Sequence, residues 1–350
     1  MSPRRIISPN CLALLLVQFN YMLHPDLLAL ACQLYGTTPE SLVPLSGGHY
    51  NAVYQFTQGD QAAILRIGVE DCPPSQTLAM LDWVSYLANN AAPVTSPLTS
   101  RNGLLMESLE FEGSRYTLTA FEKVEGTLAE TIPVSAWTPS LFQSIGRAAG
   151  KFHRISARYQ PEDPGLTRPT WFESYEILEA TRKLTGSSDP ARQQLQDLIE
   201  ELKQLPRSQE DFGMIHDDLH FANFLIKPDG SMVIIDFDDC QWGWFAIDIA
   251  MALFDSMVLD NPTSEAHARE FAQTFLANYL AGYRKEFSIS PYWLGQIPRF
   301  LKLKELCIYA DLLDHPQASQ PGNWVGDFMQ GRSRRITDNL PYVELEFTLL

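Results

Sequence analysis

Cysteine, basic residues and long apolar runs are scarce in this chain. Its 350 residues include five cysteines, none in a C-x-x-C pair. This excludes a disulfide framework or a cysteine zinc site and favours a reducing compartment, so we expect a cytoplasmic protein. Lys and Arg number 26 against 42 Asp and Glu, a formal charge of -16. Such an excess of negative charge repels phosphate backbones and anionic membrane surfaces, so we expect neither nucleic acid nor membrane as a partner.

The first residues need a separate interpretation. Arg4 and Arg5 precede the apolar run 11–19, which resembles a weak signal peptide, but no small-residue cleavage site follows it. An upstream start codon, with Met22 as the alternative start, or a loosely attached extension is the favoured reading of residues 1–24. No later segment approaches the ~18 apolar residues that a membrane helix requires.

The chain is longer than one core normally supports, which predicts two lobes. Lobe 25–120 begins with a helix at 25–34 and continues with runs of alternating apolarity separated by glycine turns. We expect five antiparallel strands and one further helix, the strands at 41–45, 52–56, 62–67, 103–108 and 114–122 and the helix at 76–90. The fold class is therefore α+β, with a small sheet lobe ahead of a larger helical lobe.

After residue 126 the apolar spacing becomes helical. We expect lobe 127–350 to contain helices at 139–157, 189–204, 245–258, 264–285 and 296–313. Four aromatic residues spaced four apart in the fourth helix predict a core-facing stripe, which comprises Phe271, Phe275, Tyr279 and Tyr283.

The segment 215–248 concentrates two His and seven Asp between apolar runs. His216, Asp218 and Asn223 read as H-x-D-x-x-x-x-N. Two short apolar strands then flank the turn Lys227-Pro228-Asp229-Gly230, a strong hairpin signal. A hairpin brings Asn223, before its first strand, close to Asp236, after its second.

This arrangement suits phosphoryl transfer, which requires metal ligands near the phosphates and a carboxylate that orients the attacking hydroxyl. Asp218 is the candidate base, and Asn223 and Asp236 are the candidate metal ligands. His216 is a further catalytic candidate, although a hydrogen-bonded role in orienting the loop is favoured for it. Asp229 is interpreted as a turn residue, and Asp217 and Asp239 as solvated carboxylates.

The same segment resembles the aminoglycoside phosphotransferase and choline kinase superfamily, small-molecule kinases with the protein-kinase-like fold. That family's loop reads H-G-D-x-H-x-x-N, and its metal aspartate opens I-D-F-D; this chain has MIHDDLHFANFLI and VIIDFDD. The resemblance implies ATP and Mg²⁺ as cofactors, Asp218 as base, and Asn223 and Asp236 as Mg²⁺ ligands. It also implies that Asp248 braces the catalytic loop. Asp217 replaces the usual glycine.

The resemblance extends to the smaller lobe, with departures. Gly47 and Gly48 stand in the turn that covers the ATP phosphates in that family, although two glycines between strands also suit an ordinary hairpin. Arg66 occupies the place of the phosphate-binding lysine and can hold phosphate bidentately. Met80 stands where the following helix should provide a glutamate. Three acidic residues are alternative partners for Arg66, namely Glu70, Asp71 and Asp82.

By the same resemblance, residues 121–126 are the hinge, and adenine lies against Phe121, Glu122 and Val124. Phe121 is equally interpretable as a core residue. The acceptor contacts are sought among acidic and aromatic residues of the larger lobe: Asp238, Asp239, Trp242, Trp244, Glu305 and Tyr309. Ordinary packing for the tryptophans and a solvated surface for the acids are the alternatives.

We therefore expect an ATP- and Mg²⁺-dependent phosphotransferase acting on a hydroxyl of a small molecule, such as an amino sugar, amino alcohol or homoserine-like acceptor. The negative charge of the chain favours a cationic acceptor. The alternatives are a bacterial stress-response Ser/Thr protein kinase, a non-catalytic nucleotide-binding pseudokinase and, less favoured, a metal-dependent phosphohydrolase. The sequence does not define the oligomeric state.

Overall fold

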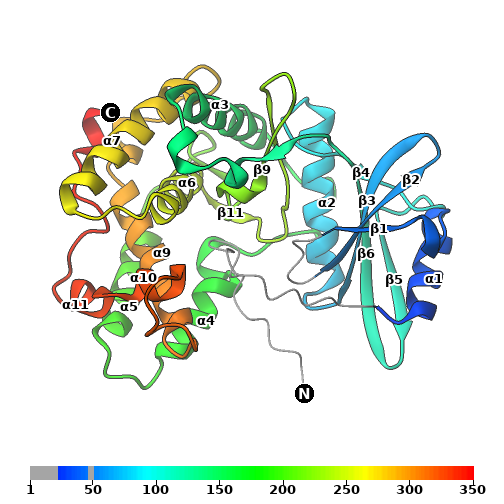
Figure 1. Ribbon diagram of the computed structural model, residues 1–350, viewed down its shortest axis with the longest axis horizontal. Coiled ribbons are helices and arrows are strands. Elements are labelled where there is room, and N and C mark those ends of the chain that lie inside the picture. Colours follow the sequence, from blue (N-terminus) through cyan, green and yellow to red (C-terminus); the bar gives the residue numbers. More distant parts are fainter. Residues whose placement is uncertain (1–22, 46–50) are drawn as a thin grey trace.

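Alternating apolar residues fold the first part of the chain into an antiparallel sheet (Figure 1). The structure is a computed structural model that describes residues 23–45 and 51–350. The sheet contains the five expected strands and a two-residue addition, with bounds β1 (Val43–Leu45), β2 (Asn51–Gln58), β3 (Gln61–Val69), β4 (Pro97–Leu98), β5 (Met106–Phe111) and β6 (Ser114–Glu122). The strand order is β1-β2-β3-β6-β4, and β5 also pairs with β6. Gly47 and Gly48 lie outside the described residues.

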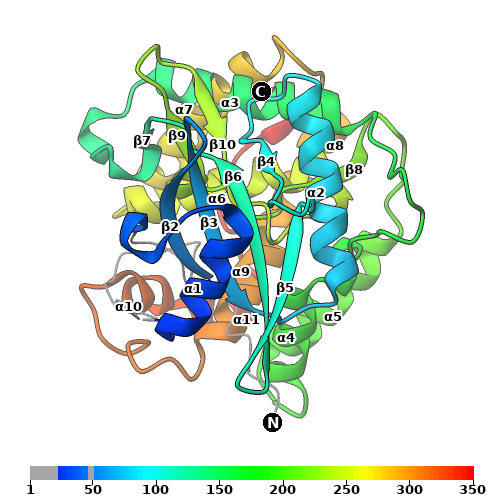
Figure 2. The same cartoon turned by 90° about the vertical axis from the view of Figure 1, so that its right-hand side faces the viewer.

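The smaller lobe has its own apolar core. Helix α1 (Pro25–Tyr35) lies against the sheet (Figure 2), where its Tyr35 packs edge-on against Phe56 of β2 at 6.1 Å between ring centroids. The Tyr35 hydroxyl donates to the backbone oxygen of Leu118 in β6. Helix and sheet therefore form one unit.

Helix α2 (Pro74–Asn89) buries its apolar face in the core of the larger lobe. Its Trp83 is fully buried, packs against Phe152 and Phe237, and donates from Nε1 to Ser156 Oγ at 3.2 Å. Asp82 of the same helix accepts from the Tyr159 hydroxyl at 2.6 Å. By its contacts, α2 belongs with the larger lobe.

The larger lobe is mostly helical (Figure 1). Its helices are α3 (Pro139–Ser156), α4 (Tyr175–Leu184), α5 (Pro190–Lys203), α6 (Phe245–Asp260), α7 (Glu265–Tyr283), α8 (Pro291–Leu294), α9 (Ile297–Leu312), α10 (Trp324–Met329) and α11 (Arg332–Thr337). Five of these were predicted; α4, α8, α10 and α11 were missed because they are short or carry many polar residues. Short 3₁₀ turns lie at Pro39–Ser41, Ala129–Thr131, Val134–Ala136, Trp171–Glu173, Phe221–Asn223 and Phe347–Leu349.

Two small strand groups in the larger lobe carry the acid-rich segment 215–248. The three-stranded group has the order β10-β9-β7, and β11 pairs with β8. Their bounds are β7 (Thr127–Leu128), β8 (Phe212–Ile215), β9 (Phe224–Ile226), β10 (Met232–Ile234) and β11 (Gln241–Trp244). No helix within the described residues is long and apolar enough to cross a membrane.

Helices α3 and α7 approach each other closely because glycines face the partner backbone. A Cβ added at Gly146 would lie 2.0 Å from the Tyr279 backbone oxygen, and one at Gly282 would lie 1.9 Å from that of Gln143. The predicted aromatic stripe of α7 is buried at three of its four positions and intermediate at the fourth, Phe271. The glycines thus set the separation at which this stripe packs.

We predict that Gly146→Ala lowers the free energy of unfolding by about 3 kcal/mol, because the methyl group must push two backbones apart. Urea denaturation measures the change. Gly295→Ala is the matched control, since the nearest atoms to its added Cβ lie at 3.3 Å, and it should cost under about 1 kcal/mol. Equal effects of the two substitutions would contradict the close approach of α3 and α7.

Candidate active site

The hairpin predicted in the acid-rich segment is present. Strand β9 pairs antiparallel with β10, with Ile226 opposite Met232. The Ile235 amide donates to the Asn223 backbone oxygen at 3.0 Å. Asn223 and Asp236 therefore lie at the same end of the hairpin, next to the loop 216–223 that follows β8.

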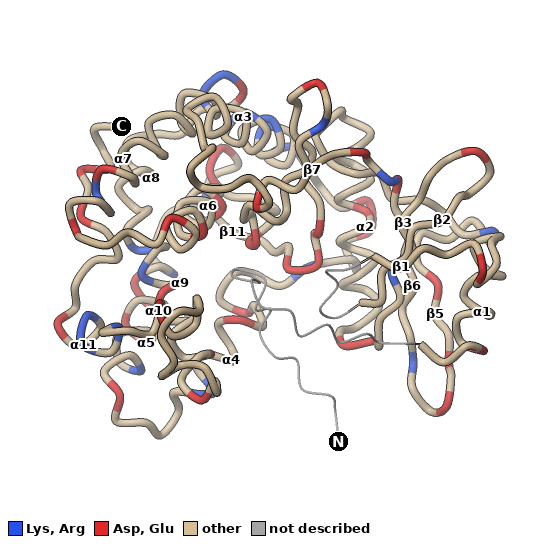
Figure 3. The backbone as a smooth tube through the Cα atoms, in the orientation of Figure 1, with Lys and Arg blue, Asp and Glu red and all other residues tan. Residues whose placement is uncertain are grey.

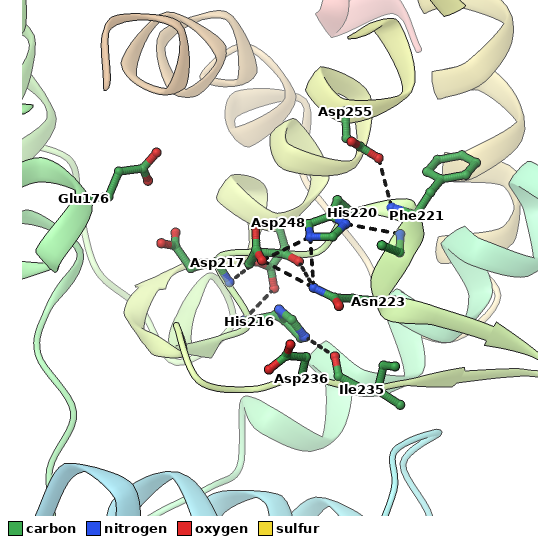
Figure 4. A network of polar contacts seen from close by, with 12 residues as sticks. Glu176, His216, Asp217, His220, Phe221, Asn223, Ile235, Asp236, Asp248 and Asp255 are labelled. Carbon is green, nitrogen blue, oxygen red and sulfur yellow. Dashed lines mark hydrogen bonds and ion pairs between the residues drawn. The ribbon is translucent and has the colours of Figure 1, made fainter. Parts of the chain in front are cut away.

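Asp248 holds this loop in place (Figure 4). Its side chain is fully buried in the first turn of α6. It accepts from the His216 amide at 3.0 Å and the Asp217 amide at 2.8 Å. It also accepts from His153 Nε2 at 2.9 Å. Charge-assisted hydrogen bonds of this kind are stronger than neutral ones. His153 in turn contacts the Tyr283 hydroxyl at 2.8 Å, which links the loop to α3 and α7.

Asp217 is not the simple solvated carboxylate that we expected. Its φ of 66° lies in the left-handed region, which glycine adopts most readily, and this explains the glycine usual at this position. Its side chain is directed toward Glu176 of α4 (Figure 4), which pairs with Lys304 at 2.9 Å. Burial, together with Glu176 and Asp248, raises the pKa of Asp217 well above its ordinary value.

His216 has the geometry of an orienting residue. The ring is fully buried, lies 4.9 Å from the Phe237 ring between centroids, and contacts the Ile235 backbone oxygen through Nε2 at 2.9 Å. This contact ties the loop to the end of the hairpin. It leaves the ring too enclosed to meet a reacting group.

Asp218 lies at the centre of the loop. Its Oδ2 accepts from His220 Nε2 at 3.1 Å, and its backbone oxygen accepts from Asn223 Nδ2 at 2.8 Å. Burial alone would raise the pKa of the Asp218 carboxyl, but His220 lowers it below its usual range. His220 Nδ1 lies 3.1 Å from the Ala222 amide nitrogen, so both ring nitrogens contact the loop. Asp218 is therefore held as an oriented carboxylate.

Sequence reasoning assigned no role to His220 or to Asp255. The Asp255 side chain accepts from the Phe221 amide at 2.9 Å and thereby anchors the far end of the loop (Figure 4). Burial raises the pKa of Asp255 to about 6, although nearby His220 opposes the shift. A signal was available, because Asp255 follows Asp248 by two helical turns and so shares its face of α6.

The donor set at the hairpin end suits Mg²⁺, which prefers oxygen ligands and usually takes one or two carboxylates together with substrate phosphates. Asn223 Nδ2 is engaged by Asp218, so its amide oxygen faces the opposite side. Asp236 already has a cation beside it, Arg66 Nη2 at 3.3 Å. Among residues 23–45 and 51–350, no three His, Cys, Asp or Glu side chains form a metal-binding group.

Arg66 projects from β3 to the acid-rich segment and contacts both Asp236 and Asp238. Burial alone would lower the pKa of the guanidinium, but Asp238 and Asp236 raise it above its ordinary value. Asn51 of β2 also donates to Asp238 Oδ2, at 3.2 Å. Asp238 therefore faces the small lobe and Arg66 and is not placed as an acceptor contact.

The three acidic residues considered as alternative partners of Arg66 do not contact it in the structure. Glu70 pairs with Arg115, Asp82 bonds to Tyr159 and Asp71 is exposed. Met80, which stands where a glutamate was expected, is buried.

The predicted hinge follows β6. The Glu122 amide donates to the Ser96 backbone oxygen at 2.8 Å and the Lys123 amide to that of Ala62 at 3.0 Å. Phe121 is only 7% exposed and has the Arg66 guanidinium 5.9 Å from its ring centroid. Its core interpretation therefore holds, while Glu122 and Val124 remain partly exposed.

Two of the proposed acceptor contacts, Glu305 and Tyr309, are buried and already have partners inside the larger lobe. Glu305 is fully buried between Lys302 and Arg332, and the Tyr309 hydroxyl donates to Asp189 at 2.8 Å. Neither the acceptor role nor a solvated surface fits Glu305.

Near β11, the tryptophans are packed against other residues, whereas Asp239 is exposed. Trp244 is fully buried, and Trp242 stacks on Tyr159 with 6.3 Å between centroids, so both pack as the alternative interpretation expected. Asp239 is exposed at the surface, yet the protein around it and the neighbouring Asp218 and Asp238 raise its pKa to about 7. It remains a candidate contact.

A cavity of about 620 Å³ adjoins the loop on the side of His220 and Ala222. This volume lies within the range of pockets that hold small organic ligands. Its walls come from the end of α6, the start of α7 and the segment 322–344. The walls include acidic and aromatic side chains, among them Glu130, Asp255, Trp324, Asp327 and Tyr342.

Comparison with known proteins shows the family of this chain. The model of the phosphotransferase enzyme family matches residues 41–286. An amicoumacin kinase of Bacillus subtilis (strain 168) is 29% identical over 327 residues, which covers 93% of this chain and 95% of that protein.

Solved structures give the same picture. An amicoumacin kinase in complex with AMP-PNP, Ca²⁺ and Ami superposes with a TM-score of 0.81 at 28% identity, covering 93% of this chain and 96% of the other. A microcompartment-associated aminopropanol kinase shares the fold, with a TM-score of 0.70 at 23% identity over 90% of this chain and 98% of the other.

We predict that Asp248→Ala lowers the free energy of unfolding by about 3 kcal/mol, because two loop amides and His153 lose a buried charged acceptor. Amide hydrogen exchange at His216 and Asp217 should accelerate more than exchange elsewhere in the core. Asp260→Ala, on the same helix and paired with the partly exposed His267, is the control and should cost under about 1 kcal/mol. Unchanged exchange at the two loop amides would show that Asp248 does not hold the loop.

Proposed function

This chain belongs to the phosphotransferase enzyme family, and we propose that it transfers the γ-phosphoryl group of ATP to a hydroxyl of a small molecule. The observation that carries the proposal is the placement of the Asp218 carboxylate beside Asn223 and Asp236 at one end of a hairpin. Phosphoryl transfer requires a base and metal ligands at one point, and this arrangement supports those roles for the three residues.

In this proposal Asp218 orients the acceptor hydroxyl and takes its proton. The hydroxyl oxygen forms a bond to the γ-phosphorus while the bond from that phosphorus to the bridging oxygen breaks, and ADP leaves with the bond's electron pair. The hydrogen bond from His220 fixes the carboxylate in one orientation, at 3.1 Å. Positioning of this kind is the main contribution of a protein to phosphoryl transfer.

The cofactor sites follow from the same geometry. Asn223 and Asp236 would hold Mg²⁺, which neutralises negative charge on the phosphates when it is bound. Arg66 is assigned to the phosphates, and Glu122 and Val124 at the hinge to adenine. AMP-PNP and Ca²⁺ accompany the related amicoumacin kinase, which supports a nucleotide and a divalent ion at this site.

We assign the acceptor to the cavity of about 620 Å³. His220 lines this cavity and contacts Asp218, so the cavity borders the loop that carries the proposed base. The three arginines of the lining each pair with a glutamate, Arg332 with Glu305, Arg335 with Glu265 and Arg269 with Glu344. The cavity walls therefore keep acidic groups, including Asp255 and Glu130, available to an acceptor.

These walls favour an acceptor that bears an amine. A protonated amine is attracted by carboxylates and by the faces of aromatic rings, which Trp324 and Tyr342 supply. The overall predominance of acidic over basic positions, visible in Figure 3, acts in the same direction. Amicoumacin, the substrate in the name of the B. subtilis relative, is the first acceptor to test.

The alternatives fit less well. A protein kinase needs an open surface for a polypeptide, whereas this cavity is walled by the segment 322–344. A phosphohydrolase would use several His and Asp ligands, and the described ranges contain no such group. A pseudokinase would lack the base or the metal ligands, and Asp218, Asn223 and Asp236 are all present.

The test is an ATP-consumption assay with Mg²⁺ against amicoumacin, amino alcohols, homoserine, aminoglycosides, neutral sugars and a generic protein. We predict that Asp218→Asn lowers kcat at least about 1,000-fold while the affinity for AMP-PNP changes less than about threefold, because the base is lost but the phosphate contacts stay. Asp229→Asn, in the hairpin turn, is the matched control. Turnover retained by Asp218→Asn would refute the assignment of the base, and nucleotide binding without turnover of any acceptor would favour the pseudokinase.

We further predict that Asp255→Asn raises KM for an amine-bearing acceptor about tenfold and leaves KM for its N-acetylated form unchanged, because only the amine pairs with the carboxylate. Asparagine can still accept from the Phe221 amide. In the unmodified enzyme, KM for the amine should rise as pH falls through about 6, where Asp255 takes up a proton, and the variant should lack this change. Equal losses for both acceptors would place the amine elsewhere.

A further inference from the structure

Arg66 lacks the partner that its position in the fold would normally receive from α2. That helix presents Met80, which is 3% exposed, where an acid was expected. Trp83 of the same helix is buried in the core of the larger lobe, where it donates to Ser156. Asp82 accepts a hydrogen bond from the Tyr159 hydroxyl. None of these three side chains can hold a guanidinium toward the phosphates.

The Arg66 side chain nevertheless needs a fixed anion. It is 14% exposed, and a charge with so little contact with water must be compensated by a paired group. The Phe121 ring forms one wall beside it, at 5.9 Å. The ring can restrict the guanidinium but supplies no full negative charge.

Among the described residues, two carboxylates contact Arg66, and one of them is available to position it. Asp236 is a proposed metal ligand, so its charge is needed by the cation of the nucleotide. Asp238 lies two residues on, accepts from Arg66 Nη2, and takes a second hydrogen bond from Asn51 Nδ2 at 3.2 Å.

The backbone around Asp238 is held by hydrogen bonds from Arg168. Arg168, which is 8% exposed, donates from Nη2 to the Asp238 backbone oxygen at 2.5 Å and from Nε to that of Cys240 at 2.6 Å. These bonds fix the turn after β10, so the Asp238 carboxylate stays in reach of Arg66 when Asp236 changes partner.

We propose that Asp238 is the positioning residue for Arg66, taking the place of the acid that α2 lacks, and that it holds the guanidinium toward the nucleotide phosphates. This inference rests on the proposed function, because it assigns Arg66 to those phosphates. Since Arg66 and Asn51 belong to the sheet and Asp238 to the larger lobe, the same contact joins the two lobes around the nucleotide.

The test is a double-mutant cycle on nucleotide binding, measured by calorimetry with AMP-PNP and with adenosine in the presence of Mg²⁺. Arg66→Ala and Asp238→Asn should each weaken AMP-PNP binding about tenfold, and the double variant should be no weaker than the weaker single variant. Adenosine has no phosphate, so its affinity should change less than about twofold in every variant. Asp229→Asn, at the turn end of the same hairpin, serves as the control for the loss of one carboxylate charge away from Arg66.

Each outcome decides the matter. Additive losses in the cycle would overturn the inference, as would equal losses for adenosine and AMP-PNP, which would indicate a general structural defect. Asp238→Glu, which keeps the charge, should recover part of the AMP-PNP affinity; recovery by Asp238→Leu in its place would also overturn it. If the unmodified protein binds adenosine but not AMP-PNP, Arg66 has no phosphate to contact and the inference fails. If it binds neither, the proposed function fails as well.

Discussion

The buried carboxylate of Asp248 is the interaction on which the rest of the site depends. It lies in the first turn of α6, where the positive end of the helix dipole favours an anion. It gathers the amides of His216 and Asp217 and the ring of His153. The loop that carries Asp218 therefore begins from a point fixed jointly by α3, α6 and, through Tyr283, α7. A left-handed residue inside that loop persists because the surrounding bonds impose it.

Local sequence patterns predicted the parts of the fold that are governed by local rules. Apolar periodicity indicated the long helices, and the turn before Ser231 indicated the hairpin that brings Asn223 and Asp236 together. Helix α4 was missed because its sequence, YEILEATRKL, is largely polar and only a narrow stripe of it is buried. Its Glu176 faces the loop beside Asp217, a proximity of residues far apart in the chain that no local pattern encodes.

The parts of the candidate site whose geometry follows from local sequence spacing were predictable. The contacts that depend on a residue far away in the chain were not. Glu305 and Tyr309 looked accessible in sequence, but Arg332 and Asp189 satisfy them inside the lobe. Arg66 was identified, yet its partners Asp236 and Asp238 lie about 170 residues away. The segment 322–344, which walls the cavity, lies beyond the family match at 41–286. The proposed base and metal ligands thus belong to the part of the chain that the family model matches, and much of the wall of the proposed acceptor cavity does not.

The docking of α2 has a mechanical consequence. The small lobe contains one apolar core formed by α1 and the sheet, whereas α2 packs into the other core through Trp83. A movement of the sheet relative to the larger lobe would therefore leave Trp83 in place and displace the sheet along α2, which it contacts at β4. Side chains between them keep their packing in such a shear motion, which limits each step to small translations. Such a movement is a shear motion along α2 and differs from a hinge rotation of the whole small lobe.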